Sequence, residues 1–442
     1  MAELLAGETS AHRFADNKRL YTSLLAAYFT PNRKFSMNPS PLAGIRVLDL
    51  SKVLAGPLCA QYLGDMGADV IKIETPGQGD ETRHWPPFRE AGNDTTGAVF
   101  LSANRNKRSL CVDLKTEAGR NVIRRLAKWA DIAVASFGPG VAEKLGVDAQ
   151  TLRSCNARLI YCDISGFGSQ GPMREGKGYD VILQSFTGML AITGEPNGPH
   201  VRSPFSPVDQ ATGLQALIGI LAALYRRERT GDGGTVEASL FDTATGLLGY
   251  FLQSFWERGT EPEKPGSGHE SLCPYQVFET ADKPLILGVA NDTLWKRFCA
   301  LTGMGDIVDH PDYRTNADRV RNRAKTVALV AQALLGRGRD AWLKQLDEAG
   351  IPASPLHTLG ELSEHPHTRE SGMKFDYDHP VLGKLKGVAQ PLRFDGERTQ
   401  LRRPPPLHGE HSQEILQELG YSEREIQALL PVEAQDESAQ VI

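Results

Sequence analysis

The stretch of sequence that decides the fold is Ile45–Glu74, which reads IRVLDLSKVLAGPLCAQYLGDMGADVIKIE. Its apolar run IRVLDL is typical of a buried strand, LCAQYLGDMG of a helix, and ADVIKIE of a second strand. Pro57 falls in the first turn of the predicted helix, where proline is favoured, and Gly67 falls near the helix end. The stretch therefore predicts a βαβ unit, in which the two strands run parallel.

Strand-like and helix-like runs continue to alternate beyond this unit. They are RSLCVDL (108–114), TEAGRNVIRRLAKWA (116–130), DIAVAS (131–136) and LIYCDIS (159–165). This alternation predicts the α/β class, with a Rossmann-like large domain built on a mainly parallel sheet.

The second half of the chain changes character after the linker ERGTEPEKPGSGHES (257–271), which is rich in Gly, Pro and charged residues. A new apolar run, VFETADKPLILGVA (277–290), precedes helical segments and predicts a smaller α+β domain. We therefore divide the chain into four parts. These are an N-terminal tail at 1–40, a large α/β domain at 41–250, a small domain at 265–355 and a C-terminal segment at 365–432 that returns to the large domain.

Composition and charge argue against several classes of protein. The 442 residues carry a formal net charge of -5 and no basic stripe, so nucleic acid is not an expected partner. The six scattered cysteines contain no CxxC pair and predict buried free thiols rather than a metal site. No run reaches the roughly eighteen apolar residues of a membrane span, and no secretory signal is found, so no membrane is expected. A cytoplasmic protein is predicted, or a mitochondrial matrix protein in a eukaryote, with residues 1–36 interpreted as a tail or as an extension ahead of Met37.

Glycine-rich loops follow several predicted strands, and ligands of α/β sheets bind at these strand ends. Ser51–Pro57 leads into a helix N-terminus, which favours a phosphate or a carboxylate, but it lacks the GxGxxG motif of nicotinamide enzymes. Gly171–Gly178 matches a phosphate-binding P-loop except that glycine replaces the final Ser or Thr. Because that hydroxyl binds Mg²⁺, a nucleoside triphosphatase is disfavoured, and Lys177 is left as a point charge for a phosphate.

Two aspartates stand in front of predicted helices. Asp209 precedes the apolar run LQALIGILAAL, and Asp180 precedes VILQSFTGML. Taken alone, each is more often a helix cap than a catalytic residue. The other interpretation is a nucleophile, because a carboxylate that is ionised at pH 7 needs no base to activate it.

Ordered motifs along the chain resemble those of the family III CoA transferases, also called the CaiB/BaiF family. The resemblance covers Pro41 to about Leu430. Its motifs are VLDLSKVLAGP, LGDMGADVIKIE, GDETR, NRNKRS with VDLK, SFGPG, SGFGSQGP, GYD, the D-x-x-x-G of Asp209 to Gly213, TGDGG and PPPLHGEH. One motif would be weak, but their order and spacing favour the nucleophile interpretation of Asp209 over the cap.

The resemblance implies a CoA transferase in which Asp209 attacks a donor thioester, giving a mixed anhydride and then an aspartyl-CoA thioester that an acceptor carboxylate attacks. Asp180 corresponds to an acidic residue beside the nucleophile. The CoA thioester is a substrate, no tightly bound cofactor is implied, and the assembly is a homodimer of two interlocked rings. The residues that align with CoA contacts are Leu54, Ala55, Val112, Asp113, Leu114, Lys115, Phe137, Gly138, Lys144 and Lys177.

Several residues depart from the pattern of this family, and two of the departures, at Leu54 and at the glycine-rich flap, are from its formyl-CoA:oxalate enzymes. Leu54 replaces a glutamine, Thr75 an arginine, and Ser136 an asparagine. The sequence GSGHES (266–271) replaces the glycine-rich flap, which makes oxalate a doubtful substrate.

GSGHESLCPYQVFET (266–280) and PPPLHGEH look most like succinyl-CoA:glutarate CoA transferases, which suggests dicarboxylate acceptors. Arg83 or His269 is nominated to hold the distal carboxylate.

Two other functions stay open. A 2-methylacyl-CoA racemase is disfavoured because its catalytic histidine falls on Tyr179, and a phenol is a poor base at pH 7. The other is an acyl-CoA-binding protein without turnover.

Overall fold

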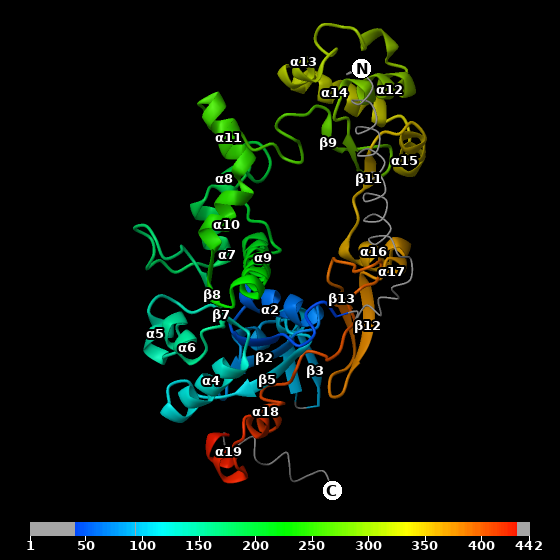
Figure 1. Ribbon diagram of the computed structural model, residues 1–442. Helices are drawn as coiled ribbons and strands as arrows, with labels where there is room; N and C mark the ends of the chain where they lie inside the picture. Colours follow the sequence, from blue (N-terminus) through cyan, green and yellow to red (C-terminus); the bar gives the residue numbers. More distant parts are fainter. Residues whose placement is uncertain (1–39, 93, 431–442) are drawn as a thin grey trace, which may run out of the picture. The chain divides into compact units, whose positions relative to one another are not determined.

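The computed structural model describes residues 40–92 and 94–430 (Figure 1). The predictions for residues 1–36 lie outside this part of the chain. Its largest element of regular structure is a six-stranded, wholly parallel sheet in the order β5-β2-β1-β6-β7-β8. The strands are β1 (Arg46–Leu50), β2 (Asp69–Glu74), β5 (Lys107–Cys111), β6 (Ile132–Ala135), β7 (Ile160–Ser165) and β8 (Gly234–Ser239). Counted along the chain, the spatial order is 3-2-1-4-5-6, which is the Rossmann arrangement and confirms the predicted fold class.

Helices cover both faces of this sheet because its strands are apolar on both sides, as parallel strands usually are. Val47 points into a core formed with α2, α7, α9 and α10, whereas its neighbour Leu48 points into a core formed with α4, α6, α18 and α19. The helices around the sheet are α2 (Ala55–Asp65), α3 (Ala98–Ala103), α4 (Glu117–Trp129), α5 (Val141–Leu145), α6 (Ala149–Cys155), α7 (Asp180–Phe186), α8 (Met189–Ile192), α9 (Pro207–Thr230), α10 (Leu240–Leu247), α11 (Gly249–Arg258), α18 (Ser412–Glu418) and α19 (Glu423–Leu429).

Among the described residues, the long helix α9 is the one that is long and apolar enough to cross a membrane by length and composition alone. A core helix of a globular fold passes the same test. α9 packs on α2, β7 and β8, and 44% of its most apolar window is buried. Gln215 and Gly219 interrupt its apolar run, so the helix contains no continuous apolar stretch of the length that a membrane span needs.

A second, three-stranded antiparallel sheet has the order β11-β10-β9 and a core of its own around Trp295 and Phe298. Hairpins β3–β4 and β12–β13 complete the strands of the described residues. The remaining elements are β3 (Phe88–Ala91), β4 (Asp94–Gly97), β9 (Tyr275–Phe278), β10 (Leu285–Gly288), β11 (Ala353–Pro355), β12 (Lys374–His379), β13 (Gly383–Val388), α12 (Asp292–Thr302), α13 (Asn316–Arg321), α14 (Arg323–Leu334), α15 (Arg339–Glu348), α16 (Leu359–Glu364), α17 (Pro366–Glu370) and the 3-10 turns η1 (Glu81–His84) and η2 (Gly305–Ile307). The domain boundaries given above stay predictions.

The C-terminal segment covers the edge strand β5 of the parallel sheet (Figure 1). The His411 amide donates to the Ser109 carbonyl at 3.0 Å, and the Cys111 amide donates to Ser412 Oγ at 3.0 Å. Ile415 and Leu416 of α18 then pack into the core below the sheet. Residues more than 300 positions apart are therefore joined beside the carboxyl end of β5.

Candidate active site

The order in which the chain adds strands to the parallel sheet reverses between β1 and β6, which makes this position the topological switch point. From β1 the chain proceeds to β2 and β5 on one side, and β6, β7 and β8 fill the other side. The loops after β1 and β6 meet there, since the Lys52 amide donates to Ser136 Oγ at 2.9 Å. Open α/β sheets bind ligands in the crevice outside the carboxyl ends of the strands at such a point. We therefore expect a substrate to bind at this edge of the sheet.

The residues aligned with CoA contacts all follow carboxyl ends of parallel strands. They are Leu54 and Ala55 after β1, Val112, Asp113, Leu114 and Lys115 after β5, Phe137, Gly138 and Lys144 after β6, and Lys177 after β7. The three lysines are exposed, whereas Ala55 and Val112 are buried. The fold thus gathers these loops at one edge, and their contact with CoA stays a prediction.

Helix α9 brings Asp209 to the same edge. α9 packs against α2, and the two backbones come very close: a Cβ on Gly213 would lie 2.5 Å from the carbonyl oxygen of Ala55. Gly213 lies four residues after Asp209 and therefore on the same face of α9. Only glycine fits there, so the D-x-x-x-G motif fixes the helix that carries Asp209 against the loop after β1.

Neither aspartate is the cap of the helix that follows it, which corrects the simplest interpretation of both. α9 begins with Pro207, and Ser206 is its N-cap in a left-handed conformation with φ 50°, so Asp209 lies inside the first turn. Asp180 is the first residue of α7, but its Oδ2 accepts hydrogen bonds from the amides of Val208 at 2.9 Å and Asp209 at 3.2 Å. Asp180 therefore caps α9 from a different helix.

Gln184 holds the Asp180 carboxylate in place. Its side-chain Nε2 donates to Asp180 Oδ1, and its Oε1 accepts from the Ser203 amide at 2.9 Å. Asp180 and Gln184 are both almost completely buried. The cap of α9 is thus a small, well-supported polar cluster rather than a surface contact.

Unlike the Asp180 carboxylate, the Asp209 carboxylate does not cap a helix. It is partly buried, and among the described residues no hydrogen-bond donor reaches its oxygens. Burial, and secondarily the negative charge of Asp180, raise the pKa of Asp209 to about 7. The folded protein therefore disfavours the ionised form of this side chain, whereas the sequence had suggested a carboxylate that is ionised at pH 7.

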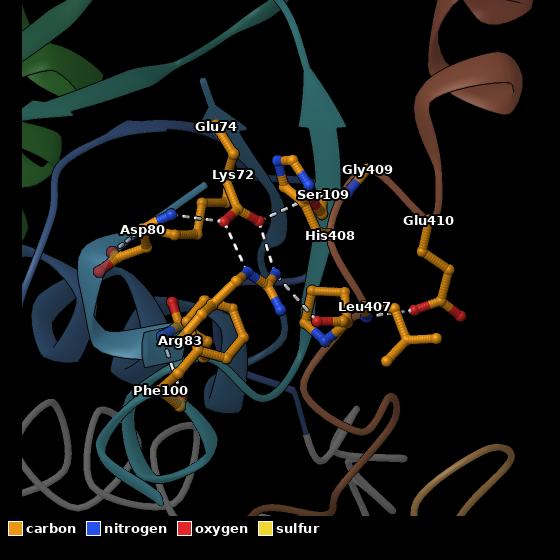
Figure 2. A network of polar contacts seen from close by, with 12 residues as sticks. Lys72, Glu74, Asp80, Arg83, Phe100, Ser109, Leu407, His408, Gly409 and Glu410 are labelled. Carbon is orange, nitrogen blue, oxygen red and sulfur yellow. Dashed lines mark hydrogen bonds and ion pairs between the residues drawn. The ribbon is translucent and has the colours of Figure 1, made fainter. Parts of the chain in front are cut away.

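A buried network of charged side chains lies beside this edge and was missed by the sequence analysis. Figure 2 shows part of it: the Glu74 carboxylate accepts hydrogen bonds from the Asp80 amide at 2.9 Å, from Arg83 at 2.7 and 2.8 Å, and from Ser109 Oγ at 2.7 Å. Burial opposes ionisation of Glu74, but Arg83 outweighs it and lowers the pKa to about 2. The signal that could have found the network is the presence of charged residues at strand positions that apolar neighbours bury.

Two further buried ion pairs lie under the loop after β1. Lys107 Nζ is 2.8 Å from Asp49 Oδ2 and donates to the Pro57 carbonyl at 2.9 Å. Lys72 Nζ lies 2.9 Å from Asp80 Oδ2. All four charged side chains are fully buried. Burial lowers the pKa of Lys107 to about 8 although Asp49 opposes this shift.

Arg83 is not available for a substrate carboxylate, which corrects its nomination. Its guanidinium makes two hydrogen bonds to Glu74 and one to the Pro406 carbonyl at 3.1 Å, and it stacks 3.6 Å from the centre of the Phe100 ring. His269 Nδ1 accepts a hydrogen bond from the Ser271 amide at 3.0 Å. Its other ring nitrogen, Nε2, is therefore the one that could bind a substrate carboxylate. The role of His269 stays a prediction.

Tyr179, which stands where a racemase would have its histidine, is the residue before α7 and is 56% exposed. It precedes Asp180 directly. Among the described residues, no group of three or more His, Cys, Asp or Glu side chains is placed to hold a metal ion.

Comparisons with known proteins agree with this geometry. A family model described as CoA-transferase family III matches residues 42–412. An acyl-CoA transferase of Fusarium pseudograminearum is 39% identical over 418 residues, covering 93% of this chain and 91% of the relative. A succinate–glutarate CoA-transferase of Agrobacterium fabrum is 37% identical over 397 residues, covering 89% of this chain and 98% of the relative. A solved CaiB/BaiF family protein of Brucella suis has a TM-score of 0.76 and 36% identity, covering 86% of this chain and 100% of that one.

Proposed function

The chain belongs to CoA-transferase family III, and from this premise we propose that it moves CoA from an acyl-CoA donor to a carboxylate acceptor through covalent intermediates on Asp209. Its relatives are named as CoA transferases, so an enzyme of the CoA transferase class is established by membership.

The proposed reaction has four steps. The Asp209 carboxylate attacks the donor carbonyl, which forms a mixed anhydride and releases CoA as a thiolate. The thiolate attacks the aspartyl carbonyl, which releases the donor acid and leaves an aspartyl-CoA thioester. The acceptor carboxylate attacks that thioester, forming a second anhydride and again freeing the thiolate. The thiolate then attacks the acceptor carbonyl, so the new acyl-CoA leaves and Asp209 is regenerated.

One observation carries the proposal: the two aspartates divide the structural and the chemical work. Asp180 caps α9, which frees the Asp209 carboxylate from any internal hydrogen bond among the described residues. A carboxylate whose only role was to cap would be bound to backbone amides, as Asp180 is. An unbound, partly buried carboxylate at the carboxyl edge of the sheet is instead suited to attack a thioester.

We propose dicarboxylates as acceptors, supported by the succinate–glutarate CoA-transferase among the relatives. A panel of acyl-CoA donors and carboxylic acids, analysed by mass spectrometry, tests the proposed exchange. With succinyl-CoA as donor, we expect glutarate to give glutaryl-CoA at a rate at least about tenfold above that of a monocarboxylate of equal chain length. Exchange with monocarboxylates alone would contradict the proposed acceptor class, and the absence of exchange with every pair would contradict the transferase reaction.

The pH dependence follows from the raised pKa of Asp209. The nucleophile is the ionised form, so kcat/KM should fall about tenfold per pH unit below pH 7 and level off above it. Asp180→Asn removes the neighbouring negative charge, which lowers the pKa of Asp209 and moves the midpoint to lower pH. Asp148→Asn is the matched control, because Asp148 also caps a helix through its side chain, at α6. A midpoint that is the same in all three proteins would contradict this electrostatic account.

We also propose a homodimer of interlocked chains. Its support is a set of exposed apolar side chains on a group of neighbouring helices. In this group α9 contacts α7 and α10, and α10 contacts α11. Ile218 on α9 is 58% exposed, Tyr225 on α9 is 68% exposed, and Phe186 on α7 is 53% exposed. Large apolar side chains exposed on neighbouring helices are typical of an interaction site. A second copy of the chain is the occupant that accounts for it most simply.

A further inference from the structure

We propose that the buried Lys72–Asp80 ion pair is a positioning device that holds Val53 in a left-handed conformation, and thereby fixes Leu54 and Ala55 for the CoA thioester. This inference rests on the proposed function, because it assumes that the loop after β1 holds CoA.

Val53 has a strained backbone. Its φ is 70°, a region that L residues avoid and that a β-branched side chain disfavours most. Glycine would adopt this conformation without steric cost. Strained residues persist only where their surroundings hold them, and they concentrate at functional sites. The conformation of Val53 therefore depends on the residues that contact its backbone.

Asp80 and Lys72 hold the loop backbone at Val53 and two residues before it. Asp80 Oδ2 accepts a hydrogen bond from the Val53 amide at 3.3 Å and lies 2.9 Å from Lys72 Nζ. Lys72 Nζ also donates to the Ser51 carbonyl at 2.9 Å. Thr82 orients the other oxygen of Asp80, through its amide at 3.0 Å and its hydroxyl at 2.7 Å. One ion pair thus forms hydrogen bonds with two backbone groups of the loop, the Val53 amide and the Ser51 carbonyl.

Other contacts leave the loop little freedom except at Val53. The Ser51 amide donates to Asp49 Oδ1 at 3.0 Å, and the Lys52 amide donates to Ser136 Oγ at 2.9 Å. A Cβ on Gly56 would lie 2.2 Å from the Ser51 Cβ, so the loop is folded tightly onto itself. No side chain among the described residues caps α2, which leaves the amides of its first turn for a ligand.

The burial of the pair supports a positioning role rather than a stabilising one. Both side chains are completely buried. Burial opposes ionisation of Asp80, yet the Lys72 ammonium outweighs it and keeps the pKa of Asp80 below its usual value. Buried ion pairs seldom stabilise a fold more than apolar residues of the same size would, whereas some of them fix one conformation among several. Here the fixed conformation is that of the loop before α2.

A double-mutant cycle on CoA affinity tests this inference. Asp80→Asn should raise the Kd for CoA and the KM for acyl-CoA about tenfold, with a smaller effect on the KM for the acceptor acid. Val53→Gly alone should change both values less than about threefold. Because glycine needs no support at positive φ, the double variant Val53→Gly, Asp80→Asn should bind CoA within about threefold of Val53→Gly. A merely structural role for Asp80 would give no such rescue.

Thr82→Val provides a milder second cycle if Asp80→Asn folds poorly. It removes one hydrogen bond to Asp80 and retains the ion pair, so the Kd for CoA should rise severalfold and again be rescued by Val53→Gly. Wild-type CoA affinity in both Asp80→Asn and Thr82→Val, or no rescue by Val53→Gly in either cycle, would overturn the inference.

Calorimetric Kd values for CoA in an Asp209→Ala background separate this inference from the proposed function. Binding does not require the nucleophile, so the rescue should be the same there. Exchange activity retained by Asp209→Ala, with rescue intact, would refute the proposed nucleophile and leave the positioning role standing. An absent rescue in a protein that still forms an aspartyl adduct would refute the positioning role alone.

Discussion

Asp209→Ala is expected to lower kcat for CoA exchange by at least about 10³-fold, because it removes the group that forms every covalent intermediate. The loss should appear with all donor and acceptor pairs, since the same side chain serves both half-reactions. The Kd for CoA should change far less. Initial rates of acyl-CoA formation, followed by mass spectrometry with saturating donor and acceptor, measure the effect.

The same substitution should not destabilise the fold. The Asp209 carboxylate makes no hydrogen bond within the described residues, and its raised pKa means that the folded protein disfavours its ionised form. The ionised side chain therefore costs stability above pH 7, where alanine removes that cost. We expect the midpoint of thermal unfolding of Asp209→Ala at pH 8 to equal or exceed that of the wild type. A folded variant that keeps more than a tenth of the activity would contradict the nucleophile assignment.

Ile218→Asp is expected to convert the protein from a dimer to a monomer. Ile218 lies in the apolar stripe of α9, between Leu214 and Tyr225. In an interface with twofold symmetry each substitution is present twice, so two unpaired carboxylates would have to be buried. Light scattering coupled to size-exclusion chromatography should give half the wild-type mass at micromolar concentration.

Ala118→Asp is the control for this experiment. Ala118 lies in the exposed first turn of α4, which covers the opposite face of the sheet, and an added carboxylate is favourable at that position. The control should retain the mass of the wild type. A wild-type protein that is monomeric, or an Ile218→Asp variant that keeps the full dimer mass, would contradict the proposed assembly.

Local sequence patterns were sufficient to predict the fold around the site. The alternation from Ile45 to Ser165 predicted parallel strands, and the strand order places the loops after β1 and β6 together. The start of α9 could have been found as well, because Pro207 is typical of a first helical position. Placing the cap at Asp209 ignored that signal.

Contacts between distant segments could not be predicted from the sequence. Asp180 caps a helix that begins 27 residues later. The residues next to Asp180 in the sequence do not indicate which helix it caps. Arg83 looked like a free cation in the motif GDETR, yet its partners are Glu74 and the carbonyl of Pro406, which is 323 residues away. Similarly, apolar residues all around α9 did not reveal which face is exposed. Such roles depend on tertiary packing, which local patterns do not encode.

Trapping the intermediate tests the central claim most directly. The protein is incubated with acyl-CoA and without an acceptor, quenched with hydroxylamine, digested and analysed by mass spectrometry. We expect a hydroxamate on the peptide that carries Asp209, and none in Asp209→Ala. A hydroxamate on another carboxylate, or active protein that gives no adduct at all, would contradict it.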